Sequence, residues 1–221
     1  MPWNLLASLV GRLSLPTLHS LGVLLGTLVG RLLRIRRKHA LAALTRAAIP
    51  NATQIVDRVY HSLGTNVFEL LWSSGKSTDA LLKTVHVDDA QWAQVHKLLS
   101  KGRGVVVATA HCGNWDLLAC AVASRIPVSV VTRHLKWRSV DRFWQHTRAV
   151  RGIRLLDSQG AFKRSQALLR QGHAVAYLLD QVPLRPNGTV TCEFLGSTAH
   201  VDLSFALLAQ RAQAPIILVC D

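Results

Sequence analysis

The length, composition and charge of the chain narrow the class of protein before any motif is considered. Its 221 residues suit one domain with a sizeable core, and 49% of them are apolar. The chain carries 26 Lys and Arg against 12 Asp and Glu, a formal net charge of +14, which indicates an anionic partner. Because only 17% of the residues are charged, the composition favours a membrane surface over nucleic acid.

The first element in chain order is an apolar segment of 21 residues, from Leu13 to Leu33, in which only His19 and Arg31 are ionisable. Its length is close to the ~20 residues that a helix needs to cross a hydrocarbon core. Three small residues at four-residue spacing give this helix one closely packing face: Gly22, Gly26 and Gly30. Three alternatives stay open, namely a membrane span, an interfacial helix and a buried hairpin. Residues 1–35 are thus expected to form a hydrophobic membrane-associating segment, and residues 36–221 the folded domain.

A basic cluster follows this segment directly, without an acidic residue among its members: Arg31, Arg34, Arg36, Arg37 and Lys38. If the segment spans a bilayer, the excess of positive charge places the following domain in the cytoplasm. If it does not span, the same cluster suits anionic lipid head groups. Both alternatives predict a location on the cytoplasmic face of a membrane.

The rest of the chain alternates between helical and strand-like patterns. Helices are expected at 37–73, with a break at Pro50-Asn51, and at 88–100. Short apolar, β-branched runs then predict buried strands at 104–110, 127–132, 153–156, 173–179 and 215–219. Helical patterns separate them at 115–124, 140–151, 161–171 and 201–213, and the turn signal Pro186-Asn187-Gly188 leads into an extra strand at 189–194. This alternation predicts an α/β fold with a mostly parallel sheet flanked by helices.

The four cysteines predict neither a disulfide framework nor a metal site. No two of them have CxxC spacing, and no neighbouring His completes a zinc pattern. They are Cys112, Cys120, Cys192 and Cys220. We expect free thiols in a reducing compartment and no bound metal.

The stretch from Thr109 to Asp116, TAHCGNWD, carries the chemistry. It begins at the end of a predicted buried strand, where α/β sheets usually place ligand sites. His111 and Asp116 would point about 140° apart on one continuous helix, but Gly113 and Asn114 permit a break between them. Asn114 can cap a new helix, and Asp116 in its first turn could then face back toward His111. An ionised carboxylate that accepts from one imidazole nitrogen leaves the other nitrogen as a base.

The stretch from Thr109 to Asp116 allows other interpretations. A GxSxG nucleophile elbow does not occur in the chain. Cys112 adjoins His111, but adjacent residues at a strand end generally point apart, which disfavours a Cys–His nucleophile. Local physics alone also allows His111 and Asp116 to be mere caps of a strand and a helix. Without a nucleophile, an oriented base suits direct attack by a substrate hydroxyl.

Further residues sit where a cleft would border the sheet. Seven cations and one acid fall within 22 residues: Arg133, Lys136, Arg138, Arg142, Arg148, Arg151 and Arg154, with Asp141. Such a rim would suit an acidic donor protein or a phosphorylated acceptor, although a solvated helix face is the plain alternative. Asp180 and Gln181 end another apolar strand and should lie on the same sheet edge as His111. Their polar atoms could hold the acceptor or brace the His111 loop.

The combined pattern resembles the late acyltransferases of lipid A biosynthesis, the lauroyl and myristoyl transferases. It is also similar to the wider group of glycerolipid acyltransferases with a His-x-x-x-x-Asp or His-x-x-x-x-Glu signature. The resemblance covers nearly the whole chain, and its order is specific although each piece alone is weak. Its pieces are the apolar segment, the basic helix, Tyr60 to Gly64, Glu69, Gly104 to Asp116, Val131 to Arg133, Arg148 to Gly152, Gly172 to Gln181, Phe194 to Gly196 and Ala206 to Val219.

This resemblance implies an enzyme that moves a fatty acyl group from an acyl carrier protein or coenzyme A thioester to a hydroxyl of a lipid A precursor at the inner membrane. His111 is implied as the general base and Asp116 as the acid that orients it. Asn114, Arg133, Arg148, Asp180 and Gln181 are candidate substrate-binding residues. No bound cofactor is implied, because the thioester donor is a substrate. A non-catalytic membrane-associated or nucleic-acid-binding protein that uses its positive charge is the alternative.

Three features depart from the family pattern. Lipid A enzymes usually carry Glu at the position of Asp116, which puts the acceptor in doubt rather than the reaction. Ser204 stands where the family tends to have Gly, which could alter an acyl pocket. The chain stops at Asp221, just past a predicted strand, whereas relatives continue, so we expect a fragment or a shortened member.

Overall fold

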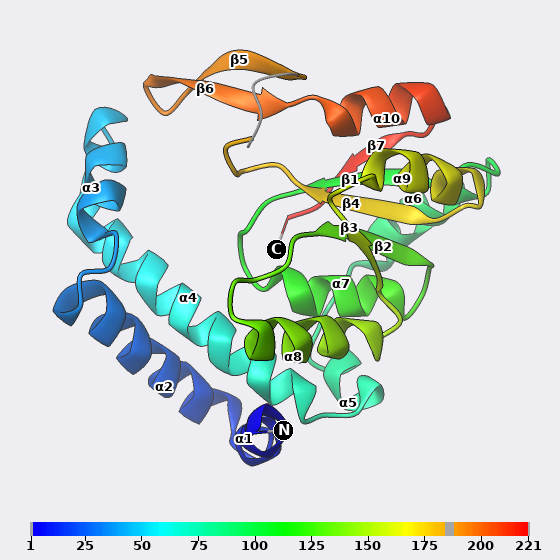
Figure 1. Cartoon of the computed structure of the whole chain (residues 1–221). Coiled ribbons are helices and arrows are strands. Elements are labelled where there is room, and N and C mark those ends of the chain that lie inside the picture. Colours follow the sequence, from blue (N-terminus) through cyan, green and yellow to red (C-terminus); the bar gives the residue numbers. More distant parts are fainter. Residues whose placement is uncertain (1, 184–187, 221) are drawn as a thin grey trace. The chain divides into compact units, whose positions relative to one another are not determined.

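The computed structural model describes residues 2–183 and 188–220 (Figure 1). The described residues form two compact units. One comprises residues 1–76 and 191–200, and the other comprises residues 77–190 and 201–221. Residues 36–76, which sequence analysis assigned to the acyltransferase domain, therefore pack in the same unit as the N-terminal apolar segment.

The N-terminal part of the first unit, up to residue 76, is built from helices. They are α1 (Pro2–Val10), α2 (Leu15–Thr27), the π-helical turn η1 (Leu28–Leu32), α3 (Arg37–Arg46) and α4 (Ala52–Ser74). The side chain of Ser14 caps α2 by accepting from the backbone N–H of Thr17. Asn51 adopts a left-handed backbone conformation directly before α4, so the predicted break at Pro50-Asn51 is confirmed. The expected apolar helix is also confirmed, as α2 continued by η1.

The second unit holds a five-stranded parallel sheet in the order β3-β2-β4-β1-β7. Its strands are β1 (Val105–Thr109), β2 (Val128–Thr132), β3 (Arg154–Asp157), β4 (Ala174–Leu178) and β7 (Ile216–Leu218). Its helices are α5 (Thr78–Leu82), α6 (Asp89–Leu99), α7 (Trp115–Ala123), α8 (Arg138–Ala149), α9 (Ala161–Arg170) and α10 (Ser204–Ala212). The predicted α/β class with a parallel sheet flanked by helices is confirmed.

The path of the chain through the sheet places a crevice beside β4. From β1 to β2 to β3 the chain moves toward one edge, and then it returns to β4 and reaches β7 at the other edge. Because parallel crossovers are right-handed, the two directions put helices on opposite faces. Figure 1 shows α7 and α8 on one face and α9 and α10 on the other. The loops after β1 and β4 therefore diverge to opposite faces, which makes a switch point where α/β sheets bind ligands.

Apolar side chains from the sheet and from α9 and α10 form the core that fixes this arrangement. Val106 on β1 and Val175 on β4 have no solvent exposure. They belong to one buried cluster with Leu169 of α9 and Leu208 of α10. Successive residues of the central strands β1 and β4 are buried, as in a parallel sheet covered on both faces, whereas the edge strand β7 is partly exposed.

A two-stranded sheet of β5 (Thr189–Phe194) and β6 (Ser197–Asp202) follows. It confirms the expected strand at 189–194, whereas β6 was not foreseen, and the preceding turn signal at Pro186-Asn187 lies outside the described residues. The helix expected from residue 201 begins at Ser204, because Val201 and Asp202 belong to β6. The Asp202 carboxylate accepts from the backbone N–H of Ser204 and marks the helix start.

Candidate active site

Two polar residues meet at the switch point because their strands pair in register. Thr109 of β1 lies opposite Leu178 of β4, and the backbone N–H of Leu179 continues the ladder to the Thr109 carbonyl. His111 and Asp180 each follow two residues after these paired positions. Neighbouring parallel strands therefore deliver the imidazole and the carboxylate to the same point of the sheet edge.

The carboxylate of Asp180 holds His111 by two hydrogen bonds. His111 Nδ1 lies 2.8 Å from Asp180 Oδ1, and the backbone N–H of His111 donates to Oδ2 over 3.0 Å. Because a carboxylate can only accept, Nδ1 carries the proton and Nε2 is left as the basic nitrogen. Gln181 Nε2 is 3.4 Å from this second nitrogen, and the Trp115 ring packs edge-on against the imidazole at 4.8 Å.

The electrostatics of this pair keep Asp180 ionised. Burial alone would raise the pKa of the Asp180 carboxyl, but the hydrogen bonds from the ring and backbone of His111 outweigh burial and lower it below its ordinary value. The His111 side chain is 30% exposed and that of Asp180 is 40% exposed. The imidazole is thus oriented and still open to a substrate.

The motif carboxylate Asp116 has a different partner from the one expected. Asn114 caps α7 as predicted, with its Oδ1 accepting from the backbone N–H of Leu117. Asp116 is buried in the first turn of α7, where its Oδ1 accepts from Arg148 Nε over 2.6 Å. The geometric prediction that Asp116 contacts His111 is therefore corrected. Arg148 of α8 offers Asp116 a charged partner in a buried place, while Asp180 reaches the imidazole from the neighbouring strand.

Arg148 ties the helices to the sheet and is not a free cation of the rim. Besides Asp116, its guanidinium donates to Thr132 Oγ1 over 3.2 Å and lies 5.0 Å from the centre of the Trp144 ring. Its side chain is only 12% exposed. These contacts join α7, α8 and the end of β2, so Arg148 fixes the wall of the site, and its predicted contact with substrate stays a prediction.

A cavity of about 1130 Å³ opens beside His111 within this unit. Its walls include aliphatic and aromatic side chains such as Val131, Phe162 and Leu179, which suit a hydrocarbon chain. Arg133 and Gln181 also line it. A cavity of this size next to an oriented base can hold an apolar substrate and the group that attacks it.

His134 and Asp141 form an ion pair on the cavity wall. His134 Nδ1 lies 2.7 Å from Asp141 Oδ2, and the backbone N–H of Leu135 donates to Oδ1. The hydrogen bond and charge of Asp141 raise the pKa of His134. In the sequence Asp141 is the one acid of a basic cluster, and His134, seven residues before it, gives no signal of this pairing.

The described residues hold no group of three or more His, Cys, Asp and Glu side chains that could bind a metal ion. Burial raises the pKa of the Cys120 thiol to about 11, and the negative charge of nearby Asp116 adds a smaller upward shift. That thiol is therefore protonated at neutral pH and is a poor nucleophile.

The second unit thus combines a parallel α/β fold with an imidazole that a carboxylate orients, beside a cavity with apolar and polar walls. The chain matches the family of bacterial lipid A biosynthesis acyltransferases over residues 3–220 and belongs to that family. A search of curated proteins found no match. Family membership makes the protein an acyltransferase of lipid A biosynthesis, and the apolar helix at Leu15–Leu32 agrees with membrane association.

Proposed function

We propose that the protein transfers a fatty acyl group from an acyl carrier protein or coenzyme A thioester to a hydroxyl of a lipid A precursor, with His111 as general base. The observation that carries the proposal is the hydrogen bond between His111 Nδ1 and Asp180 at the mouth of the cavity. It leaves Nε2 as the acceptor for a hydroxyl proton. The apolar walls would take the acyl chain.

The reaction needs little beyond a base, positioning and oxyanion stabilisation, because a thioester is already activated. His111 Nε2 takes the proton of the acceptor hydroxyl as its oxygen attacks the thioester carbonyl. The tetrahedral intermediate collapses with loss of the thiolate, which takes the proton from the imidazolium. Asp180 stays ionised throughout and stabilises the imidazolium. Asp116 is a positioning residue in this scheme, because it acts through Arg148.

The donor and acceptor would be recognised by charge. Acyl carrier proteins are acidic and lipid A precursors carry phosphates, so the exposed Arg133 on the cavity wall would attract either. We propose that the enzyme acts at the cytoplasmic face of the inner membrane, where both substrates are made.

The test uses the purified full chain in lipid vesicles with a radiolabelled acyl thioester. His111→Ala should abolish transfer, and His111→Gln should do so as well although it keeps a hydrogen-bonding side chain. Unchanged circular dichroism would show that the fold is kept. Wild-type rates in either variant would overturn the mechanism. Mass spectrometry of lipids from cells with and without the gene would identify the acceptor and the chain length.

A further inference from the structure

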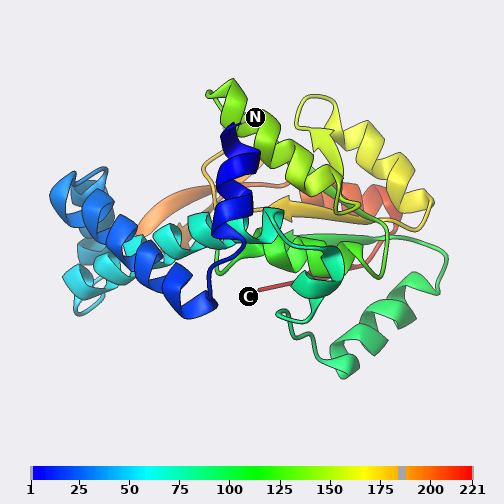
Figure 2. The same ribbon diagram turned by 90° about the horizontal axis from the view of Figure 1, so that it is seen from below.

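Helices α2 and α4 of the N-terminal unit lie antiparallel at backbone contact. A methyl group on Gly26 would collide with the backbone of Tyr60 and His61, and one on Gly64 with the carbonyl of Gly22. Figure 1 and Figure 2 both show α2 alongside α4. The glycine row at four-residue spacing, which predicted a close-packing face, is thus used within the chain itself.

One side of this helix pair is joined by polar contacts near both ends and in the middle; it is called the bonded side below. Side chains four residues apart form a row along each helix. The row at positions 19, 23, 27 and 31 of α2 and η1 faces the row at positions 57, 61, 65 and 69 of α4. His19 contacts Glu69 at 3.1 Å, and Thr27 contacts His61 at 3.1 Å. At the far end Arg31 donates to Asp57 over 2.5 Å. Val23 lies in the same row, four residues from both His19 and Thr27.

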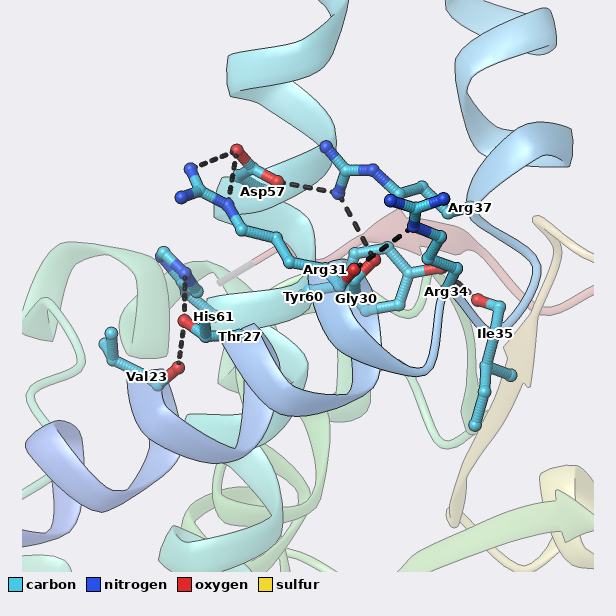
Figure 3. A network of polar contacts seen from close by, with 10 residues as sticks. All are labelled: Val23, Thr27, Gly30, Arg31, Arg34, Ile35, Arg37, Asp57, Tyr60 and His61. Carbon is cyan, nitrogen blue, oxygen red and sulfur yellow. Dashed lines mark hydrogen bonds and ion pairs between the residues drawn. The ribbon is translucent and has the colours of Figure 1, made fainter.

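Asp57 anchors that end through its contacts with two arginines, as Figure 3 shows. Arg31 and Arg37 both donate to its carboxylate, Arg37 over 2.6 Å. The hydrogen bond from Arg31 lowers the pKa of Asp57 to about 2 although burial opposes the shift. The hydroxyl of Tyr60 also donates to the carbonyl of Ile35, which closes the turn after η1.

The opposite side of the pair is aliphatic. Because the helices are antiparallel, the two rows on the other side of the glycines, one from each helix, lie on the same side of the pair. These rows contain only leucine and valine: Leu21, Leu25 and Val29 from α2 and η1, and Val59, Leu63 and Val67 from α4. The three α4 residues are 46–49% exposed. On the back of α2 and η1, Leu24, Leu28 and Leu32 are 66%, 42% and 73% exposed. An exposed apolar face of this extent marks an interaction surface.

The charges around this face select its partner. Residues 1–76 contain nine Lys and Arg against two Asp and Glu, and both acids are paired, Asp57 with arginines and Glu69 with His19. The exposed Arg34, Arg36 and Lys38 follow the end of η1 directly. Cations beside an apolar helix face are typical of binding to anionic lipid head groups.

The bonded side argues against a crossing of the bilayer. Leu15–Leu32 has 18 residues with a mean hydropathy of 1.2, which suffices for a span by length and composition. A span would surround α2 with hydrocarbon on every side that α4 does not cover. It would either separate the two helices or draw Asp57, His61 and Glu69 of α4 into the hydrocarbon. An ionised carboxylate at that depth disfavours insertion by about a hundredfold.

We propose that α2, η1 and α4 lie together in the plane of an anionic bilayer, with the aliphatic side immersed at the acyl boundary and the bonded side toward water. Both ends of α2 are then on the same side of the membrane. This concerns lipid binding alone and is tested without acyl transfer, so it stands apart from the proposed function.

Flotation of the full chain with vesicles of phosphatidylcholine and phosphatidylglycerol tests the immersion of α4. Leu63→Gln/Val67→Gln should lower the partition coefficient by about tenfold or more, since two half-exposed aliphatic side chains lose their apolar contact. Ser62→Gln is the matched control on the polar back of α4 and should bind within about twofold of wild type. Vesicles of phosphatidylcholine alone should bind more weakly. Wild-type binding by the double variant, or equal binding to both vesicles, overturns the proposal.

Nitroxide labels measure depth directly and separate the two arrangements if the double variant misfolds. In a chain whose four cysteines are replaced by alanine, Leu63→Cys and Val23→Cys are labelled and bound to the same vesicles. In-plane binding predicts that the label at 63 is accessible to oxygen and hidden from aqueous nickel chelate, and that the label at 23 is exposed to nickel. A spanning α2 predicts that the label at 23 is hidden from nickel, whether or not α4 enters the hydrocarbon with it, and this result would refute the proposal.

Discussion

The two carboxylates near His111 should fail in different ways when their charge is removed. Asp180→Asn keeps the size of the side chain but replaces an acceptor oxygen by an NH₂ group, so one of its two contacts with His111 is lost. The imidazole then loses its fixed tautomer and the anion that stabilises its charged form. A loss of turnover on the order of 10²- to 10⁴-fold follows. Because Asp180 is 40% exposed, the unfolding free energy should fall by only about 1 kcal/mol.

Asp116→Asn should act mainly on stability. Asp116 and Arg148 are 8% and 12% exposed, so the substitution leaves a buried guanidinium without its charge partner. Breaking a buried pair in this way costs about 3–5 kcal/mol, which lowers the melting temperature of a chain of this size by roughly 6–20 °C. A second substitution, Arg148→Met, should recover part of that loss because it removes the unpaired charge.

Two measurements on the same vesicle preparations separate the two effects: thermal denaturation, and initial rates at 20 °C. Where both variants are folded, Asp180→Asn should turn over at least about tenfold more slowly than Asp116→Asn. Asp116→Asn should have the lower melting temperature of the two. If Asp116→Asn loses turnover at an unchanged melting temperature while Asp180→Asn stays active, the pairing seen in the structure does not describe the working site.

Two further predictions concern charge on the cavity wall. Arg133→Glu should raise the Michaelis constant for an acidic donor or a phosphorylated acceptor more than it lowers turnover. The control Arg142→Glu, at an exposed position outside the cavity, should change the Michaelis constant little. Equal increases of the Michaelis constant in both variants would indicate an effect of general surface charge. The raised pKa of His134 means that its pair with Asp141 stabilises the fold fully below the ordinary pKa of 6.5 and loses this effect as pH rises through the folded value. His134→Gln should therefore lower the melting temperature at pH 6 and leave it unchanged at pH 9, and a deficit that is constant with pH would contradict the assignment.

The position of His111 could be predicted from sequence, but its partner could not be. A buried β-branched run followed by a polar residue is enough to place His111 at a strand end, and the same argument places Asp180 on the same edge. Which strands are neighbours depends on the direction of each crossover, and local patterns do not record it. Sequence proximity therefore favoured Asp116, five residues away, over Asp180, 69 residues away and on the adjacent strand.

Arg148 shows a second limit of the same kind. In sequence it is one of seven cations within 22 residues, which suggested a solvated or substrate-binding rim. Its contact with Asp116 joins residues 32 positions apart on two helices, and because both partners are buried, removing either one leaves an uncompensated charge. Composition can identify an excess of charge, but only packing decides which member of the cluster is internal.

Gly64 offers a test in which helix propensity and packing predict opposite signs. Replacing a mid-helix glycine by alanine favours the helix by about 1 kcal/mol, so Gly64→Ala would raise the melting temperature if α4 stood alone. In the structure the new methyl group would meet the carbonyl of Gly22 and the backbone nitrogen of Gly26, neither of which can rotate away. The helices would have to separate, at a cost of about 1–3 kcal/mol or more, so we expect a lower melting temperature. Ser62→Ala, exposed on the same helix, is the matched control and should be neutral or slightly stabilising. A rise in melting temperature for Gly64→Ala would show that α2 and α4 are not in backbone contact.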